Sequence, residues 1–374
     1  MTSLAEETVR TQQHTGVRAL FDAVVGGDTH RDSHALALLD AQGVVLAQLE
    51  VPNTEQGHVQ ALAWIAEHAP GPRVLIGLEG TRSYGIGLAR SLTAAGLPVV
   101  EVERPSRTDR RGRGKSDPID AYHAAMAVLR MNPSKLPTPR MDGDREALRI
   151  LLGARRDLTL TRTRQNNQLH ALLLTGDDSD RQLGRGTFTI ATLTTLTRRR
   201  ARARDSREQT VRRAEAARLA AALLRAHTEL KDNLAALAEL VEHVTTGLID
   251  RVGIGPVSAA QALVSFSHPG RLASEACFAA LAGVSPLQAS SGRTNRHRLN
   301  RGGDRALNRA LHDIAKTRMR CDPRTQDYVQ RRRAEGLSDR EIRRCLKRYI
   351  ARELYRALSK PAQAKTSPQP LDNT

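Results

Sequence analysis

The sequence predicts an α/β domain followed by two mainly helical segments. Residues 18–142 alternate apolar strand-like runs with amphipathic helical stretches, a pattern that needs a sheet covered by helices. Residues 143–248 have the periodicity and charge of long helices, and residues 249–360 contain further helices and many arginines. The two ends, residues 1–17 and 361–374, are polar and lack apolar periodicity, so we expect them to be disordered.

The first segment begins with three consecutive strands. These are FDAVVGGDTH, SHALALLDAQG and VVLAQLEVPN, with turns predicted at Gly26-Gly27 and at Ala41-Gln42-Gly43. A helix (HVQALAWIAEHA), a strand (RVLIGLEG), a second helix (SYGIGLARSLTAAG) and a last strand (PVVEVE) follow. A three-strand meander followed by helix-separated strands suits an RNase H-like sheet, which we predict for residues 18–142.

The second segment, residues 143–248, predicts a helical arm that is interrupted by the Gly- and Asp-rich stretch TGDDSDRQLGRG. One apolar stripe follows heptad spacing through Leu223, Leu230, Leu234, Leu237, Val241 and Val244. Such a stripe is typical of a coiled coil that pairs subunits. An amphipathic helix packed on its own domain has the same pattern over so short a run, and both interpretations stay open.

The third segment, residues 249–360, predicts a mainly helical domain with a basic surface. Ser338 and Glu341 form a capping box ahead of a helix with the apolar positions Ile342, Leu346, Ile350 and Leu354. The stretch VGIGP resembles the start of a helix-hairpin-helix, where the backbone at Gly253 and Gly255 would meet a phosphate; a plain turn between helices is the alternative. A phosphate-contacting surface is predicted from a cluster of arginines, Arg293, Arg296, Arg298, Arg301, Arg305 and Arg309.

The composition favours a nucleic-acid partner. Lysine and arginine number 58 against 40 acidic residues, and the net charge of +18 attracts polyanions. Aromatic residues make up only 3% of the chain, which argues against a base-stacking platform. The three cysteines are too few and too scattered for a disulfide framework or a zinc ribbon, and no apolar run matches a membrane span or signal peptide. We therefore expect a cytoplasmic, nucleoid-associated protein with no membrane partner.

Four acidic residues suggest phosphodiester chemistry. Asp28 and Glu79 each close an apolar strand, and Asp117 and Asp120 lie three apart at the start of the predicted helix DPIDAYHAAMAVL. Carboxylates are the hard oxygen ligands that Mg²⁺ requires, and two such ions stabilise the attacking and leaving oxygens of a phosphoryl transfer. Mn²⁺ is an alternative ion.

Each acid also has a structural explanation when taken alone. Asp117 is a natural helix N-cap, Asp28 suits a turn, and Glu79 could pair with an arginine. The alternation of Asp28, His30, Asp32 and His34 could indicate zinc, but a turn at this point is the preferred interpretation.

The stretches GGDTHRDSHALALLD, LIGLEGTRSY and GKSDPIDAYHAA, in this order, resemble the DEDD transposases, a family that includes Piv-type invertases and bridge-RNA-guided insertion-sequence recombinases. The resemblance covers nearly the whole chain apart from its ends and the loop near 176–187. It implies a RuvC-like catalytic domain in which the acids are Asp28, Glu79, Asp117 and Asp120, with Lys115 beside them in the Lys-x-Asp-x-x-Asp-Ala motif. Gly-Thr-Arg-Ser-Tyr after Glu79 departs from the family's usual Ala-Thr-Gly-x-Tyr but keeps Tyr84.

The same resemblance extends to SPLQASSGRTNRHRLNRGGDRALNRAL in the third segment. It implies that Ser291, or Ser290 as the nearest rival, is a nucleophile that forms a covalent phosphoserine link with DNA. Arg301 stands where many relatives have lysine, and the two residues are not equivalent at a phosphate site.

The resemblance further implies donor and target double-stranded DNA and a structured guide RNA. Because the acids and the serine fall in separate segments, we hypothesise that the site assembles between subunits joined by the helices of residues 143–248, in a homo-oligomer that is a dimer or a tetramer on DNA. Two alternatives stay open. A RuvC-like nuclease or junction resolvase would use water in place of Ser291, and a non-catalytic basic DNA-binding protein would need the acids only for its structure.

Overall fold

The computed structural model describes residues 16–102, 117–133, 136–140, 142–268, 271–288, 297–298, 300 and 302–359. The chain falls into two compact units. One is built mainly from residues up to Glu146, with Phe266–Phe278, and the other from Ala147–Ser265 and Ala279–Ala357. Both ends for which we predict disorder lie almost wholly outside the described residues.

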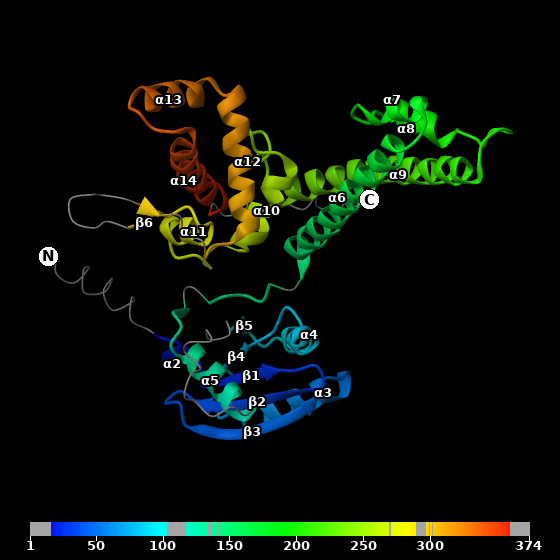
Figure 1. Ribbon diagram of the computed structural model, residues 1–374. Coiled ribbons are helices and arrows are strands. Elements are labelled where there is room, and N and C mark those ends of the chain that lie inside the picture. Colours follow the sequence, from blue (N-terminus) through cyan, green and yellow to red (C-terminus); the bar gives the residue numbers. More distant parts are fainter. Residues whose placement is uncertain are drawn as a thin grey trace, which may run out of the picture. The chain divides into compact units, whose positions relative to one another are not determined.

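The first unit contains a five-stranded sheet with the order β3-β2-β1-β4-β5 (Figure 1). The strands are β1 (Ala23–Thr29), β2 (Ser33–Asp40), β3 (Val45–Pro52), β4 (Val74–Leu78) and β5 (Val99–Glu101). The first three form an antiparallel meander, and β4 and β5 continue the sheet parallel to β1. This is the mixed sheet that the sequence predicts, and it fits an RNase H-like domain.

The prediction of a turn at Gly26-Gly27 is wrong. Both glycines are buried inside β1, where Gly26 pairs with Ala37 of β2 and with Gly77 of β4. The chain reverses instead between Thr29 and Ser33, and the backbone N–H of His30 donates to Ser33 O at 3.0 Å. Glycine is used here for close packing on a sheet face rather than for a turn.

Helices cover both faces of this sheet. On one face, α3 (Glu55–His68) and α4 (Ile86–Ala94) share a core with the strands that includes Val25, Ile76 and Trp64. On the other face lie α2 (Val17–Leu20) and α5 (Asp117–Leu129), whose core includes Val24, Leu75 and Ala125. Helix α3 starts earlier than its apolar periodicity predicts, because Thr54 caps it by accepting a hydrogen bond from Gly57 N–H.

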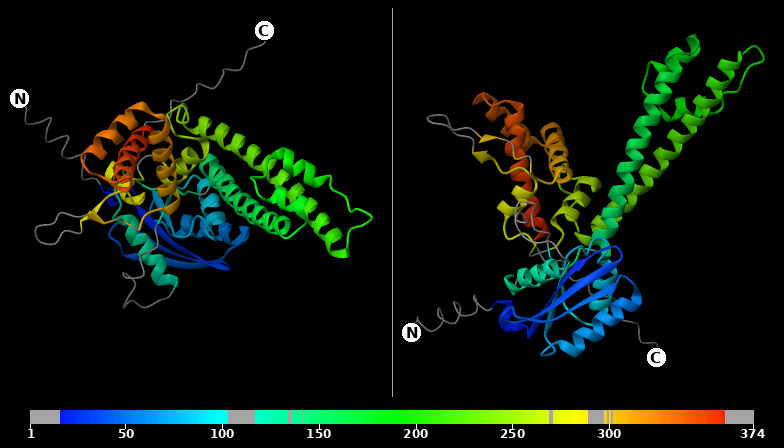
Figure 2. Two further views of the ribbon diagram at one scale, coloured as in Figure 1. Left: turned by 45° about the horizontal axis from the view of Figure 1, so that its top comes forward. Right: turned by 60° about the horizontal axis from the view of Figure 1, so that its bottom comes forward.

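Four helices make up the arm predicted for residues 143–248. The long helices α6 (Gly143–Leu174) and α9 (Arg207–Val244) run side by side, and the shorter α7 (Asp178–Gly184) and α8 (Ile190–Thr197) connect them (Figure 2). The two long helices are antiparallel. Arg155 Nη1 donates to Leu230 O at 3.0 Å, whereas Arg212 Nη1 donates to Leu172 O at 2.8 Å.

Part of the heptad stripe is buried within this chain. Leu223, Leu230, Leu237 and Val241 are buried, but Leu234 remains 36% exposed. Asn233, on the same helix, donates to Leu151 O of α6 at 3.0 Å, so α9 packs on α6 at this level. An ordinary amphipathic helix explains the buried positions, and pairing of subunits through the arm stays a prediction.

The C-terminal segment is mainly helical, as predicted. It contains α10 (Pro256–Phe266), α11 (Glu275–Leu281), α12 (Arg305–Cys321), α13 (Pro323–Ala334) and α14 (Asp339–Leu358), with a short antiparallel pair of β6 (Leu287–Gln288) and β7 (His297–Arg298). The predicted apolar positions of α14 are all buried. Glu341 Oε2 accepts hydrogen bonds from the N–H and the hydroxyl of Ser338, so the predicted pair does mark the helix start. No helix in the described part of the chain is long and apolar enough to span a membrane.

Candidate active site

Two of the four acids meet at the carboxyl end of neighbouring parallel strands. Gly27 of β1 pairs with Leu78 of β4, so Asp28 and Glu79 follow at adjacent positions. Glu79 N–H donates to Gly27 O at 2.9 Å, which extends the ladder to the glutamate itself. Asp28 is 3% exposed and Glu79 5% exposed. Parallel pairing therefore brings together two carboxylates that are 51 residues apart in the sequence.

The alternation of strand residues places both acids on the face that α5 covers. Gly26 and Gly77 lie two residues before the acids, and an added Cβ on either one would strike α5, at Ala121 O and at the Val128 side chain respectively. Because side chains repeat with a period of two, Asp28 and Glu79 point to that same face.

The third described acid belongs to α5. The C-terminal half of this helix lies near the β2–β3 turn, where the position of a Gly43 Cβ would be 3.1 Å from the sulfur of Met126. That turn is at the opposite end of β1 from Asp28, since Ala23 pairs with Asp40. Helix α5 consequently runs antiparallel to β1, and its first turn, with the half-buried Asp120, lies at the Asp28 end. Asp117 is the first residue of α5, and its side chain lies outside the described part.

One neighbour of the acids is not singled out as functional by sequence reasoning. His30 Nε2 lies 3.0 Å from Asp28 Oδ2, with the imidazole partly exposed and the carboxylate buried. The i, i+2 spacing of the two residues is the available signal, because it places them on one face where the chain remains extended. A ring at this distance can orient the carboxylate and exchange a hydrogen bond with it.

The segment after Glu79 is held close to β1. Thr29 Oγ1 donates to Glu79 O at 2.7 Å, and the position of a Gly80 Cβ would be only 2.5 Å from that hydroxyl oxygen. Gly80 has φ +69°, a conformation that favours glycine. The glutamate backbone is thus fixed on both sides. Tyr84, within the turn of residues 79–85, is half exposed.

A basic group adjoins the end of β5. Arg140 forms a buried ion pair with Glu101, and Arg145 Nη1 donates to Arg140 O at 3.0 Å. Burial alone would raise the pKa of Glu101, but the hydrogen bonds and charge of Arg140 hold it below its usual value. Burial, together with the charges of Arg82 and Arg140, lowers the pKa of Arg145 to about 10. The ion pair with Arg140 therefore gives Glu101 a structural role, although Glu101, like the catalytic candidates, lies at the end of a strand.

The donor set agrees with a hard divalent cation, because the described acids are carboxylates on one sheet face. Among the described residues, no group of three or more His, Cys, Asp or Glu side chains lies close enough together to hold a metal ion. The Asp117 side chain is not among these described residues. The structure brings Asp28 and Glu79 together and places the first turn of α5 at the same end of the sheet.

Most of the predicted serine and arginine site lies outside the described residues: Lys115, Ser290, Ser291, Arg293, Arg296 and Arg301. Arg298 belongs to β7, and its side chain is not described. Arg305 and Arg309 are exposed in the first turns of α12. The chain that flanks the serine is tightly held, since a Cβ on Gly303 would lie 2.4 Å from Gly283 N, and Asp304 N–H donates to Leu281 O at 2.6 Å.

The glycines of the helix-hairpin-helix-like start differ in their surroundings. Gly253 has φ +77°, and its Cβ would lie 3.2 Å from Ile314 O of α12, so packing alone accounts for that glycine. Gly255 has open space where a Cβ would stand. A phosphate contact at this turn remains a prediction.

The mixed sheet and the adjacent placement of Asp28 and Glu79 agree with a DEDD-type DNA transposase, and comparisons with known proteins identify the family. Residues 25–176 match the model for the DEDD transposases of IS110 elements, described as "Transposase", and residues 248–330 match that of the "Transposase IS116/IS110/IS902 family". A similar protein is the "Insertion element IS900 uncharacterized 42 kDa protein" of Mycobacterium paratuberculosis, 26% identical in an alignment that covers 83% of this chain and 89% of that protein. The chain belongs to the IS110 family of transposases and is a DNA transposase/recombinase.

Proposed function

We propose that this transposase cleaves and rejoins DNA with Mg²⁺ and a serine nucleophile, Ser291. The observation that carries the acid half of the proposal is the adjacent placement of Asp28 and Glu79 on the sheet face covered by α5. Asp117 and Asp120 complete the ligand set in the proposal, because both belong to the first turn of that helix. Mn²⁺ can replace Mg²⁺ with the same oxygen ligands.

The bound metal would neutralise charge on the scissile phosphate and on the attacking and leaving oxygens. The chain itself fixes the positions of the acids. The ladder hydrogen bond at Glu79 N–H and the Thr29 contact to Glu79 O fix the backbone that carries one carboxylate, and His30 orients the other at Asp28. Such positioning by backbone and neighbouring side chains is what phosphoryl transfer demands.

In the proposed step, the Ser291 hydroxyl oxygen forms a bond to phosphorus as one bond from phosphorus to a deoxyribose oxygen breaks. The serine hydroxyl gives up its proton, and the departing deoxyribose oxygen takes one. The phosphoserine link conserves the diester for rejoining, when a hydroxyl of another DNA end displaces the serine and the proton returns to it.

Substrate DNA is proposed to lie along basic groups in the C-terminal segment. Arg305 and Arg309 support this role because both are exposed and about one helical turn apart on α12. The remaining proposed contacts are Lys115, Gly253, Gly255, Arg293, Arg296, Arg298 and Arg301.

A DNA strand-cleavage assay on denaturing gels tests the catalytic proposal. Wild-type protein should give a protein–DNA adduct, Ser291→Ala should give none, and Asp28→Asn and Glu79→Gln should abolish cleavage. Asp32→Asn is the matched control, because Asp32 is an exposed acid on the same hairpin, with 86% of its side chain accessible. Cleavage by Ser291→Ala without an adduct would indicate water as the nucleophile. An adduct that persists in Ser291→Ala but is lost in Ser290→Ala would identify the neighbouring serine instead.

Because the acids and the serine belong to different segments, we also propose that the active site is completed between subunits, with the helical arm contributing to pairing as a coiled coil. Mixing Ser291→Ala and Asp28→Ala subunits tests this. Restored cleavage is expected, and its absence in a proven hetero-oligomer would refute assembly between subunits.

A structured guide RNA is the proposed second partner, supported by the charge of +18. Nucleic acid that copurifies with the protein should resist DNase and be destroyed by RNase. Protein free of RNA that still selects its target sequence would contradict this part of the proposal.

A further inference from the structure

The connection between α8 and α9 carries an unusual concentration of charge. Residues 198–207 include six arginines and one acidic residue, Asp205. This connection lies at the end of the helical arm where α6 finishes and α9 begins. It belongs to the compact unit that does not contain Asp28 and Glu79.

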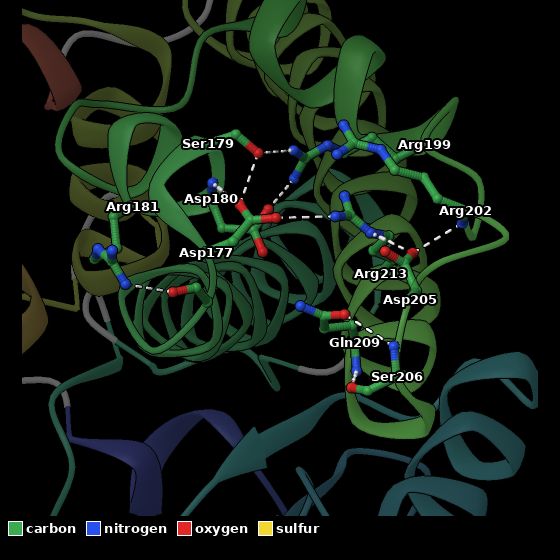
Figure 3. A network of polar contacts seen from close by, with 11 residues as sticks. Asp177, Ser179, Asp180, Arg181, Arg199, Arg202, Asp205, Ser206, Gln209 and Arg213 are labelled. Atoms are coloured by element: carbon green, nitrogen blue, oxygen red, sulfur yellow. Dashed lines mark hydrogen bonds and ion pairs between the residues drawn. The ribbon is translucent and has the colours of Figure 1, made fainter.

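One of these arginines, together with Arg213 from α9, points inward and anchors the connection (Figure 3). Arg199 is ion-paired with the buried Asp180 and donates to Ser179 Oγ at 2.9 Å. Arg213 is 4% exposed and binds Asp205 Oδ2 through Nε at 2.8 Å and Asp177 Oδ2 through Nη2 at 2.9 Å. The same Asp205 oxygen accepts from Arg202 N–H at 2.8 Å, which fixes the backbone of the connection.

Four other arginines point away from this network. Arg198, Arg200, Arg202 and Arg204, which we call the arginine loop, are all exposed. Within the part of the chain that the structure describes, none of these four side chains forms an ion pair. Asp205, the acid nearest in sequence, is only 6% exposed at its side chain and is bonded to Arg213. The structure thus buries the neutralising carboxylate and leaves the like charges outside.

Four exposed cations within seven residues repel one another, and a polyanion would relieve that repulsion. The partly positive N-terminus of α9, which Ser206 caps, adds to the attraction for an anion. Arginine is suited to phosphate because its planar guanidinium donates two parallel hydrogen bonds. The fixed backbone also lowers the entropy cost when the loop binds.

We propose that the arginine loop is a phosphate-contacting surface for double-stranded DNA at the end of the helical arm. The loop contains no aromatic residue on which unpaired bases could stack, which argues for a duplex backbone over single strands. The inference rests on the chain being a transposase that handles DNA and is independent of the proposed serine and metal chemistry.

Salt-dependent binding of full-length protein to a labelled mixed-sequence DNA duplex tests the proposal. The variant Arg200→Ala/Arg202→Ala/Arg204→Ala should bind more weakly, and the slope of log affinity against log salt should become shallower by about 0.9 for each phosphate that the variant no longer neutralises. The matched control is Arg162→Ala/Arg164→Ala/Arg225→Ala, which removes three exposed arginines from the shafts of α6 and α9. Both variants should melt like wild type, because none of the six side chains substituted forms an ion pair in the described part of the chain.

The outcomes separate cleanly. A shallower slope for the loop variant alone supports the proposal, and equal changes in both variants would show diffuse attraction and overturn it. An unchanged DNA slope with weaker binding to an RNA duplex of the same length would assign the loop to RNA and also overturn it. Since Asp28→Asn should leave the slope for this surface intact, a defect in cleavage and a defect in loop binding can be told apart.

Discussion

Substitution of Gly26 by alanine should displace the acids of α5 from those of the strands. The new Cβ would lie 2.1 Å from Ala121 O and 2.2 Å from Ala125 N, both backbone atoms of the helix. The shorter distance falls roughly 1.3 Å below ordinary van der Waals contact, and a helix backbone cannot rotate away as a side chain can. Helix α5 must therefore move, and its first turn with Asp120 moves too.

The expected cost is large for both stability and activity. Overpacking typically costs about 1–3 kcal/mol of unfolding free energy, and contact with backbone favours the upper end. A displacement of about 1 Å at a reacting centre can lower the rate about 100-fold, so Mg²⁺-dependent strand cleavage should fall by at least that factor. Urea unfolding and a cleavage time course on the same preparation measure the two effects.

Two other glycine substitutions, Gly77→Ala and Gly153→Ala, serve as controls for Gly26→Ala. A Cβ on Gly77 meets the Val128 methyl group at 2.2 Å, so the added substitution Val128→Ala should relieve the strain. Gly153 lies inside α6 with open space, and alanine there should stabilise by up to about 1 kcal/mol. Wild-type cleavage and an unchanged unfolding free energy in Gly26→Ala would refute the argument that close packing at Gly26 sets the position of α5.

Three further predictions concern buried polar groups. Burial lowers the pKa values of His34 and His58 below the usual 6.5, so the neutral rings favour the folded state. Their contribution to the unfolding free energy should be fully present above pH 6.5 and be lost as the pH falls through the lower pKa values of the folded protein. Urea titrations of His34→Leu should show a weaker decline of the unfolding free energy with falling pH. Arg140→Met should cost about 3–5 kcal/mol because it leaves the buried Glu101 carboxylate unpaired, and Arg140→Met/Glu101→Gln should recover much of that stability in thermal unfolding. Arg213→Met should speed hydrogen exchange in α7 and α8, with the sheet unaffected; unchanged protection there would contradict the anchoring role of Arg213.

Much of the fold could be predicted from local pattern. The strands, α5 and the start of α14 follow from apolar periodicity and from capping residues, which act over a few neighbours in the chain. The Gly26-Gly27 error has a tertiary origin. Gly-Gly usually marks a turn, but here α5 lies too close to β1 for any side chain at Gly26, and that requirement comes from a helix about 95 residues further on.

The site could be predicted only in part for a similar reason. The resemblance identifies Asp28 and Glu79, but their adjacency depends on the parallel register of β1 with β4, which no local pattern encodes. The alternation from Asp28 to His34 suggests a turn and so gives His30 no role, although its ring lies within hydrogen-bonding distance of Asp28. The inward role of Arg213 is equally hidden in the sequence, since only the fold pairs it with Asp177 and Asp205.

The charge distribution bears on how an acidic site can hold a polyanion. Buried carboxylates at the ends of β1 and β4 repel a DNA phosphate, so the chain needs cations elsewhere to make binding favourable. In our proposals, exposed arginines on α12 and in the arginine loop meet that need through contacts that salt weakens. Chemistry and affinity should therefore separate by mutation. Substitution of the acids should spare DNA binding, whereas substitution of the arginine loop should be overcome by lower salt or higher protein concentration, with the rate of cleavage in the bound complex unchanged.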